Sequence, residues 1–296
     1  MDSLGNIKCR EYYCSVDGNT PQKIDDKEIS LYIVTTRKCT AHCEFCEYNK
    51  GKVELNIESV KRAIDEIVKY FYLKEIHFTG GEPSLESDAI DKICKYAKTR
   101  NPLVQTSVNT NGFNLNRLES IKDLDNVAIS RHAVADSINC EVFGTNCIAY
   151  ASDILAFKDK SKLHLSCNLI KGYVDSFDKI LDYLEFAATL GINDVGLVSL
   201  MNINDYCKQH FVDFNKLNIK LTDRFTKTKC CRDVGDGASP VCCMCENYLY
   251  QASNMKLVSM YHRYAIQSNK ICSYLVFENG KLKLGFNGKT IWEDKT

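Results

Sequence analysis

The sequence lacks three features that would point to a membrane, to export or to a polyanionic partner. No apolar run reaches the roughly 20 residues that span a bilayer. The N-terminus, Met1-Asp2-Ser3-Leu4, lacks the basic and then apolar pattern of a signal peptide. Lysine plus arginine equals aspartate plus glutamate at 38 each, so no net field attracts a nucleic acid. We therefore expect a cytoplasmic protein whose partner is neither a membrane nor a nucleic acid.

Internal repeats and low-complexity linkers are also missing, so the length has to be explained by folded domains. The chain has 296 residues, and 45% of them are hydrophobic, which is ample for a buried core. One large α/β domain with an appendage fits this length as well as two equal domains do.

Cysteine, in contrast, is abundant, with 16 residues. Because an export signal is missing, we expect thiols and metal ligands rather than disulfides. Cys94 falls on the apolar face of an expected helix and Cys167 falls inside an expected strand, and both positions suit ordinary buried thiols.

Three other cysteines carry the chemistry. Cys39, Cys43 and Cys46 have the spacing Cys-x3-Cys-x2-Cys and directly follow an apolar run at 29–35. An iron–sulfur cube usually has four cysteine ligands. With no fourth cysteine nearby, a cube held here would keep one iron open, and an open iron marks a chemical site rather than a structural clip.

The hydrophobic pattern from about residue 28 to residue 201 alternates between short apolar runs and helical periods. It predicts strands at 29–35, 75–79, 103–109, 126–130, 163–169 and 195–200. It predicts helices at 57–71, capped by Asn56, at 87–97, and from 175 or 176 to 190, ended by Gly191. Alternating strands and helices favour a parallel, right-handed wound sheet. Six units are too few for a closed eight-stranded barrel, so we expect an open partial (β/α)6 barrel.

The pattern divides the chain into three expected parts. An N-terminal segment at 1–27 precedes the barrel at 28–201, and a small cysteine-rich extension at 202–296 follows it. Within the extension, the sequence from Cys272 predicts a β-hairpin that turns at Asn279-Gly280.

Four motifs together resemble the radical S-adenosylmethionine (SAM) superfamily over residues 28–201. Each follows one of the first four expected strands: Cys39-x3-Cys43-x2-Cys46, Gly80-Gly81-Glu82-Pro83, Asn109-Thr110-Asn111-Gly112 and Ile129-Ser130-Arg131-His132. The resemblance implies a barrel of that type, a [4Fe-4S] cluster on the three cysteines, and SAM bound at the open iron.

The same resemblance implies contacts to SAM. Phe45 would lie near the adenine, Gly80 and Gly81 would approach the amino group, and Glu82 would add a carboxylate acceptor. The remaining implied contacts are Asn109 and Ser130 to the ribose or methionine carboxylate, Arg131 to that carboxylate or a substrate acid, and Asn168 and Met201 to the adenine. Phe45, Asn168 and Met201 also fit plain packing.

The C-terminal cysteines suggest a second metal site. Cys231, Cys242, Cys245 and Cys272 are candidate ligands of an auxiliary iron–sulfur cluster, with Cys230 and Cys243 as alternates. The arrangement resembles a twitch-type extension, although a position where relatives often place another cysteine holds Gly285. Zinc and unligated thiols remain alternatives, because Cys242-x2-Cys245 is also a zinc-knuckle spacing.

These features predict a radical SAM enzyme that receives electrons from flavodoxin or ferredoxin and oxidises or rearranges its substrate. Only about 28 residues precede the first expected strand, too few for a leader-peptide recognition domain, so we expect a small polar metabolite as substrate. His132, His262 and Arg263 are candidates to contact it, whereas His77 fits a satisfied core histidine. The alternatives are a peptide- or protein-modifying enzyme and a non-catalytic iron–sulfur redox sensor.

Overall fold

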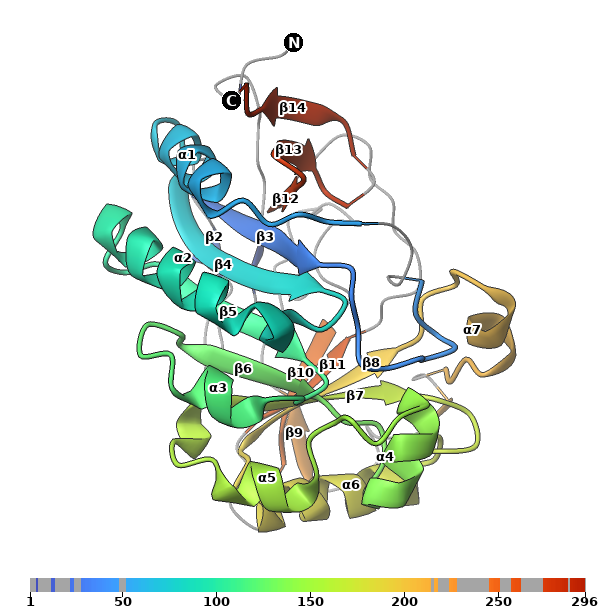
Figure 1. Ribbon diagram of the computed structural model, residues 1–296. Helices are drawn as coiled ribbons and strands as arrows, with labels where there is room; N and C mark the ends of the chain where they lie inside the picture. Colours follow the sequence, from blue (N-terminus) through green and yellow to red (C-terminus); the bar gives the residue numbers. More distant parts are fainter. Residues whose placement is uncertain are drawn as a thin grey trace.

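The fold is built on one large, mostly parallel sheet (Figure 1). The computed structural model describes residues 28–47, 52–213, 216–217, 224–227, 245–250, 257–261, 274–286 and 288–295, together with residue 4 and the two short strands β1 (Tyr12–Tyr13) and β2 (Gln22–Lys23). In those residues, a 12-stranded sheet has the order β14-β13-β12-β3-β4-β5-β6-β7-β8-β11-β10-β9.

All six predicted strands are present, and they lie side by side in chain order. They are β3 (Glu28–Thr36), β4 (Tyr72–Gly80), β5 (Gln105–Thr110), β6 (Asn126–Ser130), β7 (Leu163–Leu169) and β8 (Asp194–Ser199). Each pairs in parallel with the next. Parallel pairing brings the carboxyl ends of all six strands to the same edge of the sheet, which is where parallel α/β folds place their sites.

Helices connect these strands and lie along the outer side of the curved sheet (Figure 1). The predicted helices are confirmed as α1 (Ile57–Val68), α2 (Ser87–Arg100) and α6 (Phe177–Thr189). Asn56 caps α1 as expected, because its side chain accepts a hydrogen bond from the Ser59 N–H at 3.0 Å. The shorter helices are η2 (Pro83–Glu86), α3 (Leu115–Glu119), α4 (Asp136–Phe143), α5 (Ala151–Ala156), η3 (Lys160–Lys162) and α7 (Asp205–Gln209).

Strands from the C-terminal part of the chain extend both edges of this sheet. The hairpin of β12 (Tyr274–Glu278) and β13 (Lys281–Leu284) turns at Asn279-Gly280 as predicted, with positive φ at both residues. β12 pairs in parallel with β3, and β14 (Thr290–Glu293) pairs with β13. At the other edge, β11 (Leu257–Tyr261) pairs in parallel with β8 and is followed by β10 (Cys245–Tyr250) and β9 (Phe225–Lys227). The described strands after residue 201 therefore continue the barrel sheet.

The two faces of the sheet have different chemistry. Ile76 and Phe78 of β4 are fully buried in the main apolar core, together with side chains of α1 and α2. Glu75 and His77 alternate with them and are partly exposed, so they lie on the opposite face. The same alternation holds along β7. We call the face away from the helices the inner face; its polar side chains include Glu75, His77, Ser107, Asn109, Ser130, Ser166 and Asn168.

No helix in the described part of the chain is long and apolar enough to cross a bilayer.

Candidate active site at the carboxyl ends of the strands

The three clustered cysteines lie on the loop that follows β3. Cys39, Cys43 and Cys46 are all partly exposed thiols. The loop is fixed on one side by a hydrogen bond from the His42 N–H to the Phe143 carbonyl at 2.7 Å. Cys39 and Cys43 also pack against a small apolar cluster that contains Phe143.

The electrostatics of these thiols fit a metal cluster. Burial, together with the negative charges of the neighbouring Cys46 and Cys39, raises the pKa of Cys43 to about 12. Burial also raises the pKa of Cys39, and the negative charges of Glu82 and Cys46 add to this rise. Three thiolates could therefore coexist only beside a strong positive charge, which a bound iron–sulfur cluster would supply.

Across the described residues, no three ligating side chains converge closely enough to share one ion.

Gly80 and Gly81 allow β4 to end directly against the cysteine loop. A Cβ on Gly80 would lie 2.3 Å from the Thr36 carbonyl oxygen, and one on Gly81 would lie 2.0 Å from the Lys38 carbonyl oxygen. The Gly81 N–H donates to the Thr36 carbonyl at 2.7 Å. The sequence suggested that these glycines make room for a ligand, and the structure adds a second reason, which is the close approach of two backbones.

Glu82 links the neighbouring loops through hydrogen bonds. Its side chain is buried, and it accepts hydrogen bonds from the Thr110 hydroxyl at 2.5 Å, the Asn111 N–H at 2.8 Å and the Ser84 N–H at 2.9 Å. Burial raises its pKa, while these donors oppose the rise. Because both carboxylate oxygens are engaged, we replace the expected role as a SAM acceptor with a bracing role that joins the ends of β4 and β5.

Arg131 also differs from the expectation. It is buried, and its guanidinium donates to the Val134 carbonyl at 2.5 Å, pairs with Asp136 at 2.8 Å and lies over the Phe186 ring at 4.8 Å. It follows Ser130 in β6 and so lies away from the inner face. A guanidinium used in this way holds the loop before α4, and we no longer propose that it neutralises a bound carboxylate.

Three of the other expected SAM contacts lie on the inner face near the ends of their strands. Asn109 of β5 is exposed, and Ser130 of β6 and Asn168 of β7 are half-buried. Ser130 pairs in register with Ser166, which stands on the same face. The structure thus gathers these polar side chains at the edge where the cysteine loop begins.

Phe45 and His132 form an aromatic contact beside the cysteine loop. Their rings meet edge to face with centroids 5.2 Å apart, and His132 stacks on Phe143 at 4.9 Å. The Asn168 N–H donates to His132 Nδ1 at 3.0 Å. Burial lowers the pKa of His132 to about 3, so this imidazole is neutral. Its role here is to pack against Phe45.

Met201 follows β8 and is exposed, whereas the preceding Leu200 is buried in an apolar cluster against which Phe45 packs. Leu200 therefore belongs to the apolar cluster beside Phe45, and Met201 stays a prediction.

Most residues of the predicted C-terminal metal site lie outside the described part of the chain. Cys230, Cys231, Cys242, Cys243 and Cys272 lie outside the described residues, as do His262 and Arg263. Of Cys245, only the backbone is described, and it pairs with Tyr261 between β10 and β11.

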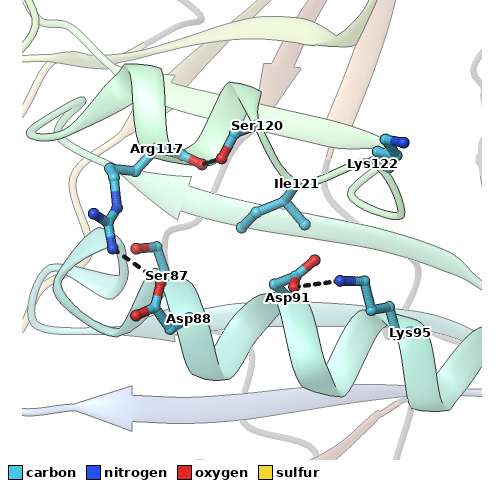
Figure 2. Close-up of a pocket in the computed structure, with 8 residues that line it drawn as sticks. All are labelled: Ser87, Asp88, Asp91, Lys95, Arg117, Ser120, Ile121 and Lys122. Carbon is cyan, nitrogen blue, oxygen red and sulfur yellow. Dashed lines mark hydrogen bonds and ion pairs between the residues drawn. The ribbon is translucent and has the colours of Figure 1, made fainter.

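A groove between α2 and α3 lies on the helical side and is separate from this site (Figure 2). Its walls carry two ion pairs, Arg117 with Asp88 at 2.9 Å and Lys95 with Asp91 at 2.6 Å. Exposed pairs of this kind fit a solvated surface.

Comparison with known proteins agrees with this geometry. Residues 33–217 match the family model for the radical SAM superfamily, which is well over half of the chain. Curated relatives named “Probable GTP 3',8-cyclase” from Sulfolobus acidocaldarius and Thermococcus kodakarensis are each 28% identical, over 57% and 55% of this chain. These matches cover 55% and 54% of the relatives, so the chain spans about half the length of the curated relatives it matches.

Solved structures show the same fold. The crystal structure of Streptococcus suis SuiB has a TM-score of 0.59 at 14% identity, covering 91% of this chain and 66% of that one. SuiB bound to its precursor peptide SuiA gives 0.51 at 17% identity, covering 62% and 42%. Enzymes of the matched family use a [4Fe-4S] cluster and SAM, and the three thiols fit the cluster. The chain belongs to the radical SAM superfamily.

Proposed function

We propose that this radical SAM enzyme acts on a small polar molecule held on the inner face of the sheet. The observation that carries the proposal is the set of polar side chains on the inner face. It extends from the cysteine loop back along the strands. His77 lies three residues before Gly80 in β4, which places it about 10 Å below the glycines at the usual rise of a strand. That depth suits a small metabolite.

The bound cofactors supply the radical, and the protein holds the cofactors in place. When bound, the cluster and SAM supply a reductively generated 5′-deoxyadenosyl radical that removes a hydrogen atom from a substrate carbon. Cys39, Cys43 and Cys46 would hold the cluster. The proposed SAM contacts are Phe45, Gly80, Gly81, Asn109, Ser130, Asn168 and Met201.

We retain the division at residues 28 and 202, and an auxiliary cluster on Cys231, Cys242, Cys245 and Cys272. We also retain a flavodoxin or ferredoxin as electron donor, and a reaction that oxidises or rearranges the substrate.

The named relatives favour the small substrate over a peptide. Two are named for a reaction of GTP and match at 28% identity. SuiB, with its precursor peptide, matches at 14–17% identity and therefore supports only the fold. A peptide-modifying enzyme is the second candidate, and a redox sensor without catalysis is the third.

The first experiment counts iron and sulfide per chain after anaerobic reconstitution of the wild type and of a Cys39→Ala/Cys43→Ala/Cys46→Ala variant. Dithionite and SAM are then added, and 5′-deoxyadenosine is measured. We expect product only from the wild type. Product from neither protein would favour the redox sensor.

A second experiment separates the two enzymatic candidates. Deoxyadenosine formation by the wild type is measured with GTP, with a panel of small polar metabolites, and with peptides of mixed sequence. Stimulation by a small molecule supports the proposal, and stimulation by peptides alone contradicts it.

A further inference from the structure

A hydrogen-bonded line of three polar side chains crosses the inner face below the candidate SAM site. His77 Nε2 lies 3.1 Å from Glu75 Oε2, and His77 Nδ1 lies 2.5 Å from the Ser107 hydroxyl oxygen. Glu75 and His77 come from β4 and Ser107 comes from β5, where His77 and Ser107 are paired in register. The side chains of Glu75 and His77 are 23% and 22% exposed, so the line is reachable from the inner face.

The charge on Glu75 decides which ring nitrogen of His77 accepts a proton. Burial alone would raise the pKa of Glu75, but the hydrogen bond and charge of His77, together with Lys74 and the hydrogen bond from Ser30, lower it overall. An ionised Glu75 accepts the Nε2–H of His77, which leaves Nδ1 as an acceptor for the Ser107 hydroxyl proton. The imidazole is therefore oriented to accept a proton through Ser107.

Aromatic rings form an apolar wall beside this line. Tyr32 of β3 stacks on His77 with centroids 4.5 Å apart and an interplanar angle of 23°. Tyr274 and Phe286 approach Tyr32 at 5.0 and 5.5 Å. A ligand with a planar ring would find ring edges and faces here, next to a proton acceptor.

A purely structural role explains this cluster poorly. The inner face needs no carboxylate for packing, and burying an ionised group costs free energy unless it is paired. A titratable pair that is kept partly exposed at the centre of a sheet, among aromatic rings, is an arrangement that binding and catalytic sites use.

We propose that Glu75, His77 and Ser107 form a proton-accepting site for the substrate, which is a planar ring bearing an acidic O–H or N–H group. This inference rests on the proposed function, because it identifies the substrate class of the same inner face. The substrate O–H or N–H bond breaks and its proton passes to the Ser107 oxygen, while the Ser107 proton passes to His77 Nδ1. The products are a substrate anion and an imidazolium beside the Glu75 carboxylate, and no electron is transferred in this step.

Other charged groups near the line leave this assignment unchanged. Lys74 adds a weaker positive charge that also favours the ionised form of Glu75. Tyr32 and Tyr274 add phenol rings rather than charged groups. The imidazole of His77 is thus the basic group of the line itself.

The test uses 4-nitrophenol, a planar O–H acid whose anion absorbs visible light while the neutral form does not. The reconstituted holoenzyme is titrated with it at a pH about one unit below the solution pKa of the phenol. We expect the bound phenol to become ionised, with at least about a tenfold rise in the anion-to-phenol ratio. Deoxyadenosine formed from SAM in phenol-free samples tests the proposed function separately.

The variants are His77→Asn, Glu75→Gln and Ser107→Ala, with His164→Asn as the matched control. His164 is also partly exposed, at 20%, and lies 3.0 Å from the carboxylate of Asp194. We expect the ionisation of the phenol to be lost in the three variants and kept in the control. A conservative Ser107→Thr variant, which keeps the hydroxyl, should also ionise the phenol. Iron content and circular dichroism check that each variant has folded.

Three outcomes would overturn the proposal: failure of the wild type to bind the phenol, binding without ionisation, or undiminished ionisation in His77→Asn. If His77→Asn does not fold, Glu75→Gln decides in the same way, because it keeps the imidazole and removes the charge that stabilises the imidazolium.

Discussion

Replacing Glu82 by glutamine tests how the loops around the cysteines are held together. Glutamine keeps one oxygen for the Ser84 N–H and the Thr110 hydroxyl, but it places an amide N–H₂ against the Asn111 N–H. In the wild type that N–H donates to Glu82 at 2.8 Å. A buried donor without an acceptor costs about 1–3 kcal/mol, and losing the charge weakens the other two bonds. We therefore expect Glu82→Gln to lower the free energy of unfolding by about 2–4 kcal/mol.

The assay is guanidinium unfolding of the anaerobic, metal-free protein at neutral pH, followed by circular dichroism. Glu86→Gln is the matched control, because Glu86 lies four residues further on and its side chain makes no capping hydrogen bond to α2. We expect the control to change stability by less than about 0.5 kcal/mol.

A Glu82→Gln protein as stable as the wild type would refute this reasoning. That result would mean that burial raises the pKa of Glu82 far enough to keep its carboxyl group protonated at neutral pH. Since the Glu82 N–H also donates to the Lys38 carbonyl at 2.8 Å, the variant should in addition bind less iron on reconstitution than the control does.

Three further predictions follow from single contacts. Gly81→Ala should abolish iron uptake by the cysteine loop, because its Cβ would lie 2.0 Å from the Lys38 carbonyl oxygen; iron counts at wild-type level would contradict this. The lowered pKa of Glu75 contributes stability above its ordinary value of 4.5 that is lost as the pH falls through its folded pKa, so Glu75→Gln should flatten the acid limb of a stability-versus-pH curve. Asn56→Ala should cost about 1 kcal/mol of unfolding free energy, measured by denaturation, and a neutral effect would show that the cap is dispensable.

The central strands could be predicted because short stretches with recurring apolar residues alternate with helical periods, and burial on the helical face places a buried residue at every second position of such strands. Asn56 and Gly191 could be predicted as helix boundaries because local chemistry decides them. The pairing of β12 with β3 and of β11 with β8 could not be predicted in this way, since parallel partners far apart in sequence leave no periodic signal.

At the site, motif positions predicted which loops meet but not what each side chain does there. Arg131 and Glu82 have the residue types that bind ligands, yet their partners come from loops whose positions only the folded chain fixes. The sequence alone favours a satisfied core position for His77. The alternation of Glu75 and His77 with Ile76 and Phe78 was the available signal that it belongs to the inner face.

The pairing of β12 with β3 has a consequence for the order of assembly. Arg37, just before the cysteine loop, pairs with Glu278 of β12, a residue 241 positions further along the chain. During synthesis, β3 and the cysteines emerge early, while their neighbouring strand emerges only after nearly all of the barrel. Contacts of such long range form slowly. The cysteine loop is therefore made well before the strand that completes its edge of the sheet, and that edge stays open until β12 docks.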